Sequence, residues 1–331
     1  MLPPGLFLPL IADHSLAIEI GEWVLDSAMQ QIEDWKAVGL SLPVSVNIDV
    51  IQLEQADFID RLRQQVAAHP GLVASDLELE VLETSALNDF TQVSAVIRAC
   101  HEMGVGFALD DFGTGYSSLT YLKRLPAGML KIDQSFVRDM LDDPDDLAIL
   151  SGVFGLATSF RRQAIAEGVE TVAHGEMLLQ LGCELGQGYA IARPMPAEDM
   201  PVWLAAWRPD SSWLNQMPIS RDDLPILFAS VEHRAWFIRV VSFIRGEGDT
   251  PPPLHHDQCR FGQWLKAEVR VRKENRLAIE ALASLHIEIH SLASELIRKK
   301  QEGQVESAMA RLIELYPLRD RLLENLLDML R

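Results

Sequence analysis

Along residues 1–207 the hydrophobic positions switch repeatedly between the spacing of a helix and that of a buried strand. Residues 17–35 carry apolar side chains at helical spacing, from Ile18 through Trp23 to Ile32, which predicts an amphipathic helix. Residues 44–50 are rich in β-branched side chains and predict a strand. The same patterns predict strands at 77–82, 105–109, 129–132 and 164–166, helices at 58–68, 90–103, 145–159 and 176–181, and a turn at 183–188.

Strands that alternate with helices are typical of parallel β–α–β units, and so of a doubly wound sheet or a barrel. The acidic and polar motifs all fall where predicted strands end, which is where (β/α)₈ barrels build their active sites. We therefore predict an α/β fold of the (β/α)₈ type. Six strand–helix units can be counted where a closed barrel has eight, so we expect an incomplete barrel that lacks its first strands.

The pattern changes after Trp207. Residues 208–212 read as a linker, and no strand pattern follows them. Residues 223–244 predict an amphipathic helix, residues 246–253 a turn rich in glycine and proline, and residues 263–331 further helices. We predict a barrel domain at 1–207, a linker at 208–218 and an all-α helical bundle at 219–331.

Composition narrows the range of partners. The 331 residues are 48% hydrophobic and carry a net charge of −19, so we do not expect a nucleic-acid polymer as partner. The three cysteines argue against a disulfide framework and fit a reducing cytoplasm. The first residues lack a basic region, which argues against a signal peptide, and no apolar run is long enough to span a membrane.

The predicted strand ends gather an unusual set of side chains. They are Asn47, Glu80, Asp110, Asp111, Lys131, Asp133, Glu167, Glu170 and Gln187. Acids crowded at one edge repel one another unless cations compensate them, and two divalent metals about 3.5–4 Å apart would organise the cluster and activate a water against a phosphodiester. Lys131 could orient that water or carry a proton, with its pKa lowered by burial or metals. The alternative role for Lys131 is a salt bridge to the neighbouring acids.

The motifs D-D-F-G-T-G-Y-S-S at 110–118, K-I-D at 131–133, E-G-V-E at 167–170 and Q-G-Y at 187–189 resemble the EAL family, in its order and spacing. Members of that family are cyclic-di-GMP phosphodiesterases with a (β/α)₈-like barrel that use Mg²⁺ or Mn²⁺ to form linear pGpG. The resemblance implies metal ligation, catalysis near the attacking water, and contacts to the site or ligand. The implied metal ligands are Asn47, Glu80, Asp110, Asp111 and Glu167. The implied catalytic residues are Lys131, Glu167, Asp111 and Glu170, of which Glu170 supports the loop. The implied binding residues are Asn47, Gln187, Thr114 and Asp133.

Two departures from the family pattern matter. Leu82 stands where the family usually has Thr, a modest change that keeps both Glu80 and Glu83. The signature E-x-L should precede Met1 together with the first two strands, and with it one metal-ligating Glu and an Arg that grips the ligand's phosphate. We therefore expect a fragment, a misplaced start or a degenerate domain, with poor turnover or none. The alternative function is a degenerate module that binds cyclic-di-GMP or a protein partner without turnover.

The bundle carries its own set of candidate ligands, His233, Cys259, His286 and His290. The last two histidines are four residues apart and would share one helix face, so both can bind the same metal ion, such as zinc. A lone histidine is more often an ordinary core or surface residue, but the combination favours a tetrahedral site. The set resembles the chemoreceptor zinc-binding (CZB) family, whose His, C-x-F-G-x-W and H-x-x-x-H elements occur here in order.

His255 and His256 are competing candidates near Cys259. We rank them below His233, which lies beside Trp236 as the family's first histidine does. The resemblance implies that the bundle senses zinc or oxidants, and a zinc-bound thiolate suits both. The sequence as a whole predicts a cytoplasmic phosphodiesterase regulated by this bundle, with a homodimer through the barrel or the bundle as a further expectation.

Overall fold

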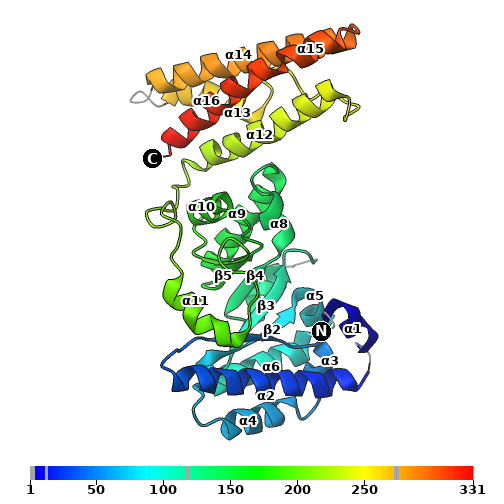
Figure 1. Cartoon of the computed structure of the whole chain (residues 1–331), viewed down its shortest axis with the longest axis vertical. Helices are drawn as coiled ribbons and strands as arrows, with labels where there is room; N and C mark the ends of the chain where they lie inside the picture. The colour runs from blue at the N-terminus through cyan, green and yellow to red at the C-terminus, as the bar shows by residue number, and fades with distance from the viewer. Residues whose placement is uncertain (1–3, 12–13, 89, 116–118, 272–275, 331) are drawn as a thin grey trace. The chain divides into compact units, whose positions relative to one another are not determined.

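The computed structural model describes residues 4–11, 14–88, 90–115, 119–271 and 276–330. The predicted motif residues Tyr116, Ser117 and Ser118 lie outside these ranges. The chain forms two compact units (Figure 1). The first unit holds the β-sheet and most of the residues of its helices, and the second is helical. The predicted boundaries at 207 and 219 remain predictions.

The first unit is built on one sheet of six parallel strands in the order β1-β2-β3-β4-β5-β6, a half-barrel with helices in the connections (Figure 1). This confirms the incomplete α/β barrel. The strands are β1 (Val44–Asn47), β2 (Leu77–Leu82), β3 (Gly106–Phe112), β4 (Met129–Ile132), β5 (Gln163–Glu167) and β6 (Leu185–Gln187). The connecting and flanking helices are α1 (Pro4–Ile11), α2 (Leu16–Ala37), α3 (Val50–Leu53), α4 (Phe58–Ala68), α5 (Glu83–Asn88), α6 (Phe90–Met103), α7 (Leu119–Arg124), α8 (Gln134–Asp139), α9 (Pro144–Ser159), α10 (Val172–Gln180) and α11 (Met200–Ala206).

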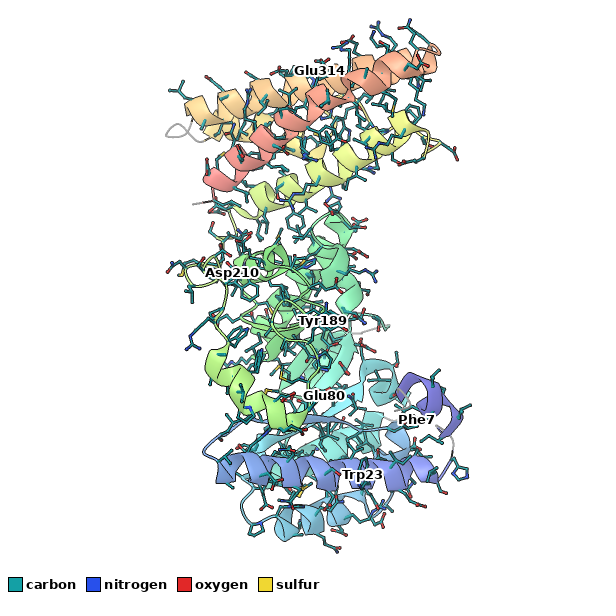
Figure 2. All side chains as sticks on the ribbon, viewed as in Figure 1. Phe7, Trp23, Glu80, Tyr189, Asp210 and Glu314 are labelled. Carbon is teal, nitrogen blue, oxygen red and sulfur yellow. The ribbon has the colours of Figure 1, made fainter. Side chains whose placement is uncertain are left out.

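Alternation along β2 explains how the sheet separates its two faces. Leu77 and Leu79 are fully buried, whereas Glu80 lies on the opposite face, because successive side chains of a strand point to opposite sides. The parallel registers pair Asn47 with Glu80, and Glu167 with Gln187. The carboxyl ends of neighbouring strands therefore meet along one edge of the sheet, and Figure 2 marks Glu80 there.

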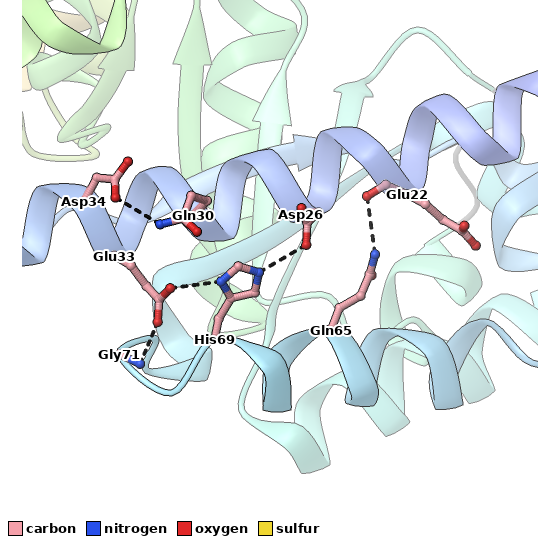
Figure 3. Close-up of polar contacts among 8 residues, drawn as sticks. All are labelled: Glu22, Asp26, Gln30, Glu33, Asp34, Gln65, His69 and Gly71. Atoms are coloured by element: carbon pink, nitrogen blue, oxygen red, sulfur yellow. Dashed lines mark hydrogen bonds and ion pairs between the residues drawn. The ribbon is translucent and has the colours of Figure 1, made fainter.

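Helix α2 is amphipathic, as predicted. It buries Leu25, Met29 and Ile32, while Trp23 is 68% exposed on its other side (Figure 2). Helix α4 is tied to α2 by His69, whose ring contacts the Glu33 carboxylate at 3.0 Å (Figure 3). A partly buried polar contact of this kind helps to fix the position of one helix against the other.

Several local details differ from the sequence predictions. The first predicted strand ends at Asn47, because Asp49 caps a short helix, α3, by accepting a hydrogen bond from the Ile51 amide. The predicted turn at 183–188 contains the short strand β6. Helix α10 begins at Val172, four residues before the predicted start. Strand β3 continues through the acidic pair to Phe112 instead of ending at Leu109.

The second unit packs its helices around one apolar core, which confirms the helical C-terminal region. They are α12 (Leu224–Arg245), α13 (Arg260–Val271), α14 (Arg276–Gln301), α15 (Val305–Arg311) and α16 (Leu315–Asp328). Val240, Ile279 and Leu326 are fully buried in this core. Gly246 ends α12 in the left-handed conformation, with φ of 85°, which glycine adopts without a steric penalty. In the described ranges, every helix is too short or too polar to pass through a lipid bilayer.

Candidate functional site

Lys131 organises the acidic edge of the sheet. Its ammonium nitrogen lies 2.7 Å from Glu80, 3.1 Å from Asp110 and 2.6 Å from Glu167. These carboxylates come from β2, β3 and β5, and Lys131 comes from β4 between the last two. Glu80, Asp110 and Lys131 are all buried. A buried charge cluster is tolerated only when its members compensate one another, and here one cation faces three acids.

A β-bulge explains how two adjacent aspartates serve one site. Leu109 pairs with Leu130 of β4, but Phe112 pairs with Ile132, so β3 inserts one extra residue at the acidic pair. Asp111 takes a left-handed backbone with φ of 52° there. Ligand oxygens of Asp110, Asp111 and Glu167 lie within 4.8 Å of one another. In a regular strand neighbouring side chains would point to opposite faces.

Asp111 is electrostatically crowded. Burial, together with the charges of Asp110 and Asp133, raises its pKa to about 6. The Thr114 hydroxyl donates to the Asp111 carbonyl at 2.8 Å and so fixes the loop that follows. Like charges held this close favour a divalent cation between them.

Glu83 was not among the predicted site residues, yet it holds the glycine-rich loop. Its buried carboxylate accepts a hydrogen bond from the Gly113 amide at 2.9 Å. Gly113 has φ of 103°, a conformation that glycine adopts readily. The sequence signal was its match to the second acid of the family pattern, three residues after Glu80 and directly after the end of β2.

A second loop pair borders the acidic cluster. A cavity of about 210 Å³ is lined by Gln134, Glu167, Gly168, Glu170, Gln187, Gly188 and Tyr189. The Val169 amide donates to the Gln187 carbonyl at 3.0 Å, and a Cβ at Gly188 would lie 2.3 Å from the Val169 nitrogen. Only glycine therefore lets the two loops approach this closely. Arg193 stacks over the Tyr189 ring at 4.4 Å.

The predicted residues differ in how closely they gather. Glu80, Asp110, Asp111, Lys131 and Glu167 form the cluster described above. Asn47 is exposed and lies next to the cluster, because it pairs with Glu80 in the register of β1 and β2. Asp133 lies beside Asp111. Glu170 and Gln187 line the cavity, and Thr114 is exposed on the glycine-rich loop.

The expected lowering of the Lys131 pKa is not what the structure shows. Burial does disfavour the charged ammonium, but hydrogen bonds to Glu167 and Glu80 and their negative charges outweigh burial and raise the pKa of Lys131. The lysine therefore stays protonated among these acids. The salt-bridge role that the sequence left open is the one present in this structure.

The second cluster lies in the helical unit. Ligand atoms of His233, Cys259, His286 and His290 all lie within 4.8 Å of one another. His233 comes from α12, His286 and His290 stand one turn apart on α14, and Cys259 precedes α13. The structure thus brings the four predicted side chains together from three segments.

Backbone contacts preset the histidines as metal ligands. Nδ1 of His233 lies 3.2 Å from the Ala229 carbonyl and Nδ1 of His290 lies 3.0 Å from the Leu254 carbonyl, so each Nδ1 acts as donor. Among the described residues, neither His233 Nε2 nor His290 Nε2 has a hydrogen-bond partner, although both are buried. Unpartnered buried nitrogens with free electron pairs are what a metal would satisfy.

Burial keeps these imidazoles neutral. It lowers the pKa of His233 to about 3 and that of His286 to about 2, with the neighbouring histidines adding to the effect. Burial also raises the pKa of the Cys259 thiol, while the Gly262 amide, 3.2 Å from Sγ, acts in the opposite direction. Three neutral imidazoles and one cysteine sulfur fit a tetrahedral zinc ion.

Fold and clusters together define a half-barrel with an oxygen-rich site at its strand ends, joined in one chain to a helical bundle with a His₃Cys cluster. The EAL domain family matches residues 1–194, and the chemoreceptor zinc-binding domain family matches residues 233–297. The chain belongs to the EAL domain family and carries a chemoreceptor zinc-binding domain after its EAL domain.

Similar proteins are known for the first unit. The chain is 43% identical over 201 residues to the bifunctional diguanylate cyclase/cyclic di-GMP phosphodiesterase MucR of Pseudomonas aeruginosa, covering 60% of this chain and 29% of that protein. It is 37% identical to the cyclic di-GMP phosphodiesterase PA2567 of the same organism, covering 61% and 34%. The chain thus spans about a third of the length of these relatives.

A solved structure gives the same assignment. The structure described as the PaMucR phosphodiesterase in complex with c-di-GMP shares 44% sequence identity and superposes with a TM-score of 0.58. The match covers 60% of this chain and 81% of that one. The first unit is therefore homologous to a protein that was crystallised with cyclic di-GMP.

Proposed function

We propose that the protein is a cyclic-di-GMP phosphodiesterase that opens the cyclic dinucleotide to linear pGpG, and that its bundle binds zinc and regulates this reaction. The observation that carries the proposal is the cluster of Asp110, Asp111 and Glu167 at the strand ends, with their oxygens within 4.8 Å. The homologous c-di-GMP complex supports the choice of substrate.

The acidic edge supplies the ligands that hard divalent ions prefer. Asn47, Glu80, Asp110, Asp111 and Glu167 would hold Mg²⁺ or Mn²⁺ through carboxylate and amide oxygens. Two such ions would, when bound, polarise the phosphate and lower the pKa of a bound water. The crowding that raises the pKa of Asp111 is the physical reason this edge favours cations.

The cavity beside Glu167 would receive the substrate. Its volume of about 210 Å³ accommodates part of the dinucleotide. Gln187 and Glu170 offer hydrogen-bonding groups there, and Tyr189 with Arg193 offers a flat surface on which a base can stack. Thr114 and Asp133, on the loops after β3 and β4, would border the other side.

Lys131 would act as a donor. Because its ammonium stays protonated, it would hold the attacking water or a phosphate oxygen by a hydrogen bond and stabilise the negative charge that develops on the phosphate oxygens. In the reaction the water oxygen bonds to phosphorus, the bond from phosphorus to the 3′ oxygen breaks, and that oxygen takes up a proton. One water is consumed and linear pGpG is formed.

The test measures pGpG formation by chain 1–331 with Mn²⁺, alongside cyclic-di-GMP binding. We expect weak but Mn²⁺-dependent pGpG formation, and a further fall of more than tenfold, or over about 1.4 kcal/mol in transition-state stabilisation, in Asp110→Asn and in Lys131→Ala. A role is wrong if its variant keeps more than about a tenth of the activity. Binding by the wild-type chain with no pGpG above the Asp110→Asn level would instead support a module without turnover.

In the bundle, His233, Cys259, His286 and His290 would hold zinc, which would join three segments of the chain. The thiolate of Cys259 is the ligand that an oxidant can remove, which would make the site responsive to oxidants as well as to zinc. We also propose that the protein is cytoplasmic, because its three free cysteines fit a reducing compartment. We further propose that it forms a homodimer through the barrel or the bundle.

A further inference from the structure

A fifth imidazole lies beside the His₃Cys cluster. The ring centroid of His256 is 6.2 Å from that of His286, and the two rings meet edge-on at 79°. His256 is half-buried, whereas its neighbour His255 is exposed. Atoms of His256 are not among the four that lie within 4.8 Å of one another. We propose that His256 is a reserve ligand, which takes the fourth position at the zinc when the Cys259 thiolate is lost.

This inference rests on the proposed zinc site, and it explains why one of the four ligands can change while the others cannot. His233, His286 and His290 are 4%, 1% and 2% exposed and sit inside the bundle. Cys259 is half-buried and lies just before α13, at the end of a turn. A ligand at the rim of a site is the one that solvent, oxidants and side-chain motion reach first.

The turn that carries Cys259 also carries His256, three residues earlier. The Cys259 sulfur lies 3.4 Å from the His256 carbonyl oxygen, and the Gln258 amide donates to the His255 carbonyl at 3.1 Å. A Cβ at Gly262 would lie 1.9 Å from the His256 carbonyl oxygen, so the backbone here is packed closely against the start of α13. His256 can therefore approach the cluster by rotating its side chain, with its backbone held in place.

Charge explains why His256 stays in reserve while the thiolate is present. A thiolate contributes one negative charge to a dication, and the Gly262 amide, 3.2 Å from the sulfur, stabilises that charge further. A neutral imidazole offers neither advantage. Once the thiolate is lost, zinc retains three histidines and an open position, and His256 is the nearby donor that can complete four-coordination.

Oxidation by a peroxide is one way to lose the thiolate. The Cys259 sulfur attacks one peroxide oxygen, the O–O bond breaks, sulfur is oxidised by two electrons to a sulfenate, and the other oxygen leaves and is protonated to water. With His256 as the new ligand, the zinc site would change from one negative ligand to four neutral ones. The signal would then be a gain of one positive charge on zinc and its four ligands, with the metal retained and the negative charge left on the displaced sulfenate of Cys259.

The experiment uses Co²⁺ in place of zinc in the full chain, because tetrahedral cobalt and a sulfur–cobalt charge-transfer band can be followed separately. Wild type should show both signals. Cys259→Ala should lose the charge-transfer band and keep tetrahedral cobalt, and peroxide-treated wild type should do the same. His256→Ala alone should keep one metal per chain and both signals.

The decisive comparison is between two double variants. Cys259→Ala/His256→Ala should bind Co²⁺ and Zn²⁺ at least tenfold more weakly than Cys259→Ala, and added imidazole should restore the tetrahedral spectrum. The matched control Cys259→Ala/His255→Ala should behave like Cys259→Ala. Equal affinities for Cys259→Ala and its His256 double variant, or an equal loss in the His255 control, would overturn the inference. Wild type without bound metal would overturn the zinc site itself as well.

Discussion

Lys131 illustrates how one residue sets the state of a whole site. Its ammonium group faces Glu80, Asp110 and Glu167, all within hydrogen-bonding distance. Sequence alone predicted that these residues meet, because they end neighbouring strands. Sequence alone could not predict the direction in which the pKa of Lys131 shifts, because that direction depends on whether burial or the three carboxylates have the larger effect.

His69 gives a residue-scale prediction about pH. Burial lowers the pKa of its ring, but contacts with Glu33 at 3.0 Å and Asp26 at 3.2 Å outweigh burial, so the pKa is raised overall (Figure 3). The folded state therefore holds the proton more tightly than the unfolded chain, in which a histidine has a pKa of about 6.5. The stabilisation is complete below that pH and is lost as the pH rises through the raised folded value.

We therefore expect His69→Phe to destabilise the chain more at pH 5.5–6 than at pH 9, as measured by urea unfolding at both pH values. The matched control is His101→Phe, since His101 is an exposed histidine on α6. A loss of stability that is the same at both pH values would mean that His69 acts through packing and not through its charge.

At the scale of elements, Trp213 anchors the predicted linker to α10. Its ring nitrogen donates to the Val172 carbonyl at 2.9 Å, and a Cβ at Gly175 would lie 2.4 Å from the Trp213 ring. Helix α10 begins two residues after Glu170, which lines the candidate substrate cavity. The segment around Trp213 is thus attached next to a loop of the candidate active site.

Gly175→Ala should displace Trp213 and destabilise the first unit by about 1–3 kcal/mol, because overpacking a tight contact forces its neighbours to move. Thermal unfolding and proteolysis within residues 208–218 would report both effects. Gly152→Ala is the control, since the space around Gly152 in α9 is open, and it should be neutral or slightly stabilising. Unchanged stability and proteolysis in Gly175→Ala would contradict the anchoring role.

Helices α12 and α14 and the turn before α13 meet at the His₃Cys cluster, so zinc bound there should link these three segments and stabilise the bundle. We expect one zinc per chain in the wild type and a lower content in His286→Ala and His290→Ala, whereas Cys259→Ser should bind zinc more weakly than the wild type but retain it. Chelation should loosen the bundle without unfolding it, because its core of leucine, isoleucine and aromatic side chains remains. Metal analysis with circular dichroism checks both points, and full zinc retention by the His286 and His290 variants would place the site elsewhere.

Across the whole molecule, sequence predicted what depends on local pattern and motif. Periodicity placed β2 and β4 at their observed bounds, and motif spacing ranked His233 above His255 and His256. The misses depended on tertiary contacts. Strand β6 is only three residues long and exists because it pairs with β5, and the bulge at Asp111 exists because β3 and β4 shift register there. Glu83 was missed for the same reason, since its partner Gly113 is 30 residues away.

The central claim is that the zinc bundle controls the acidic site in the same chain. The most direct measurement is the rate of pGpG formation at fixed Mn²⁺ by zinc-loaded and zinc-free chain, with His286→Ala/His290→Ala as the control for zinc acting elsewhere. The account predicts a difference of at least about fivefold in the wild type, a coupling of roughly 1 kcal/mol, and no zinc dependence in the control. Equal rates for zinc-loaded and zinc-free wild type, or the same zinc effect in the control, would contradict it.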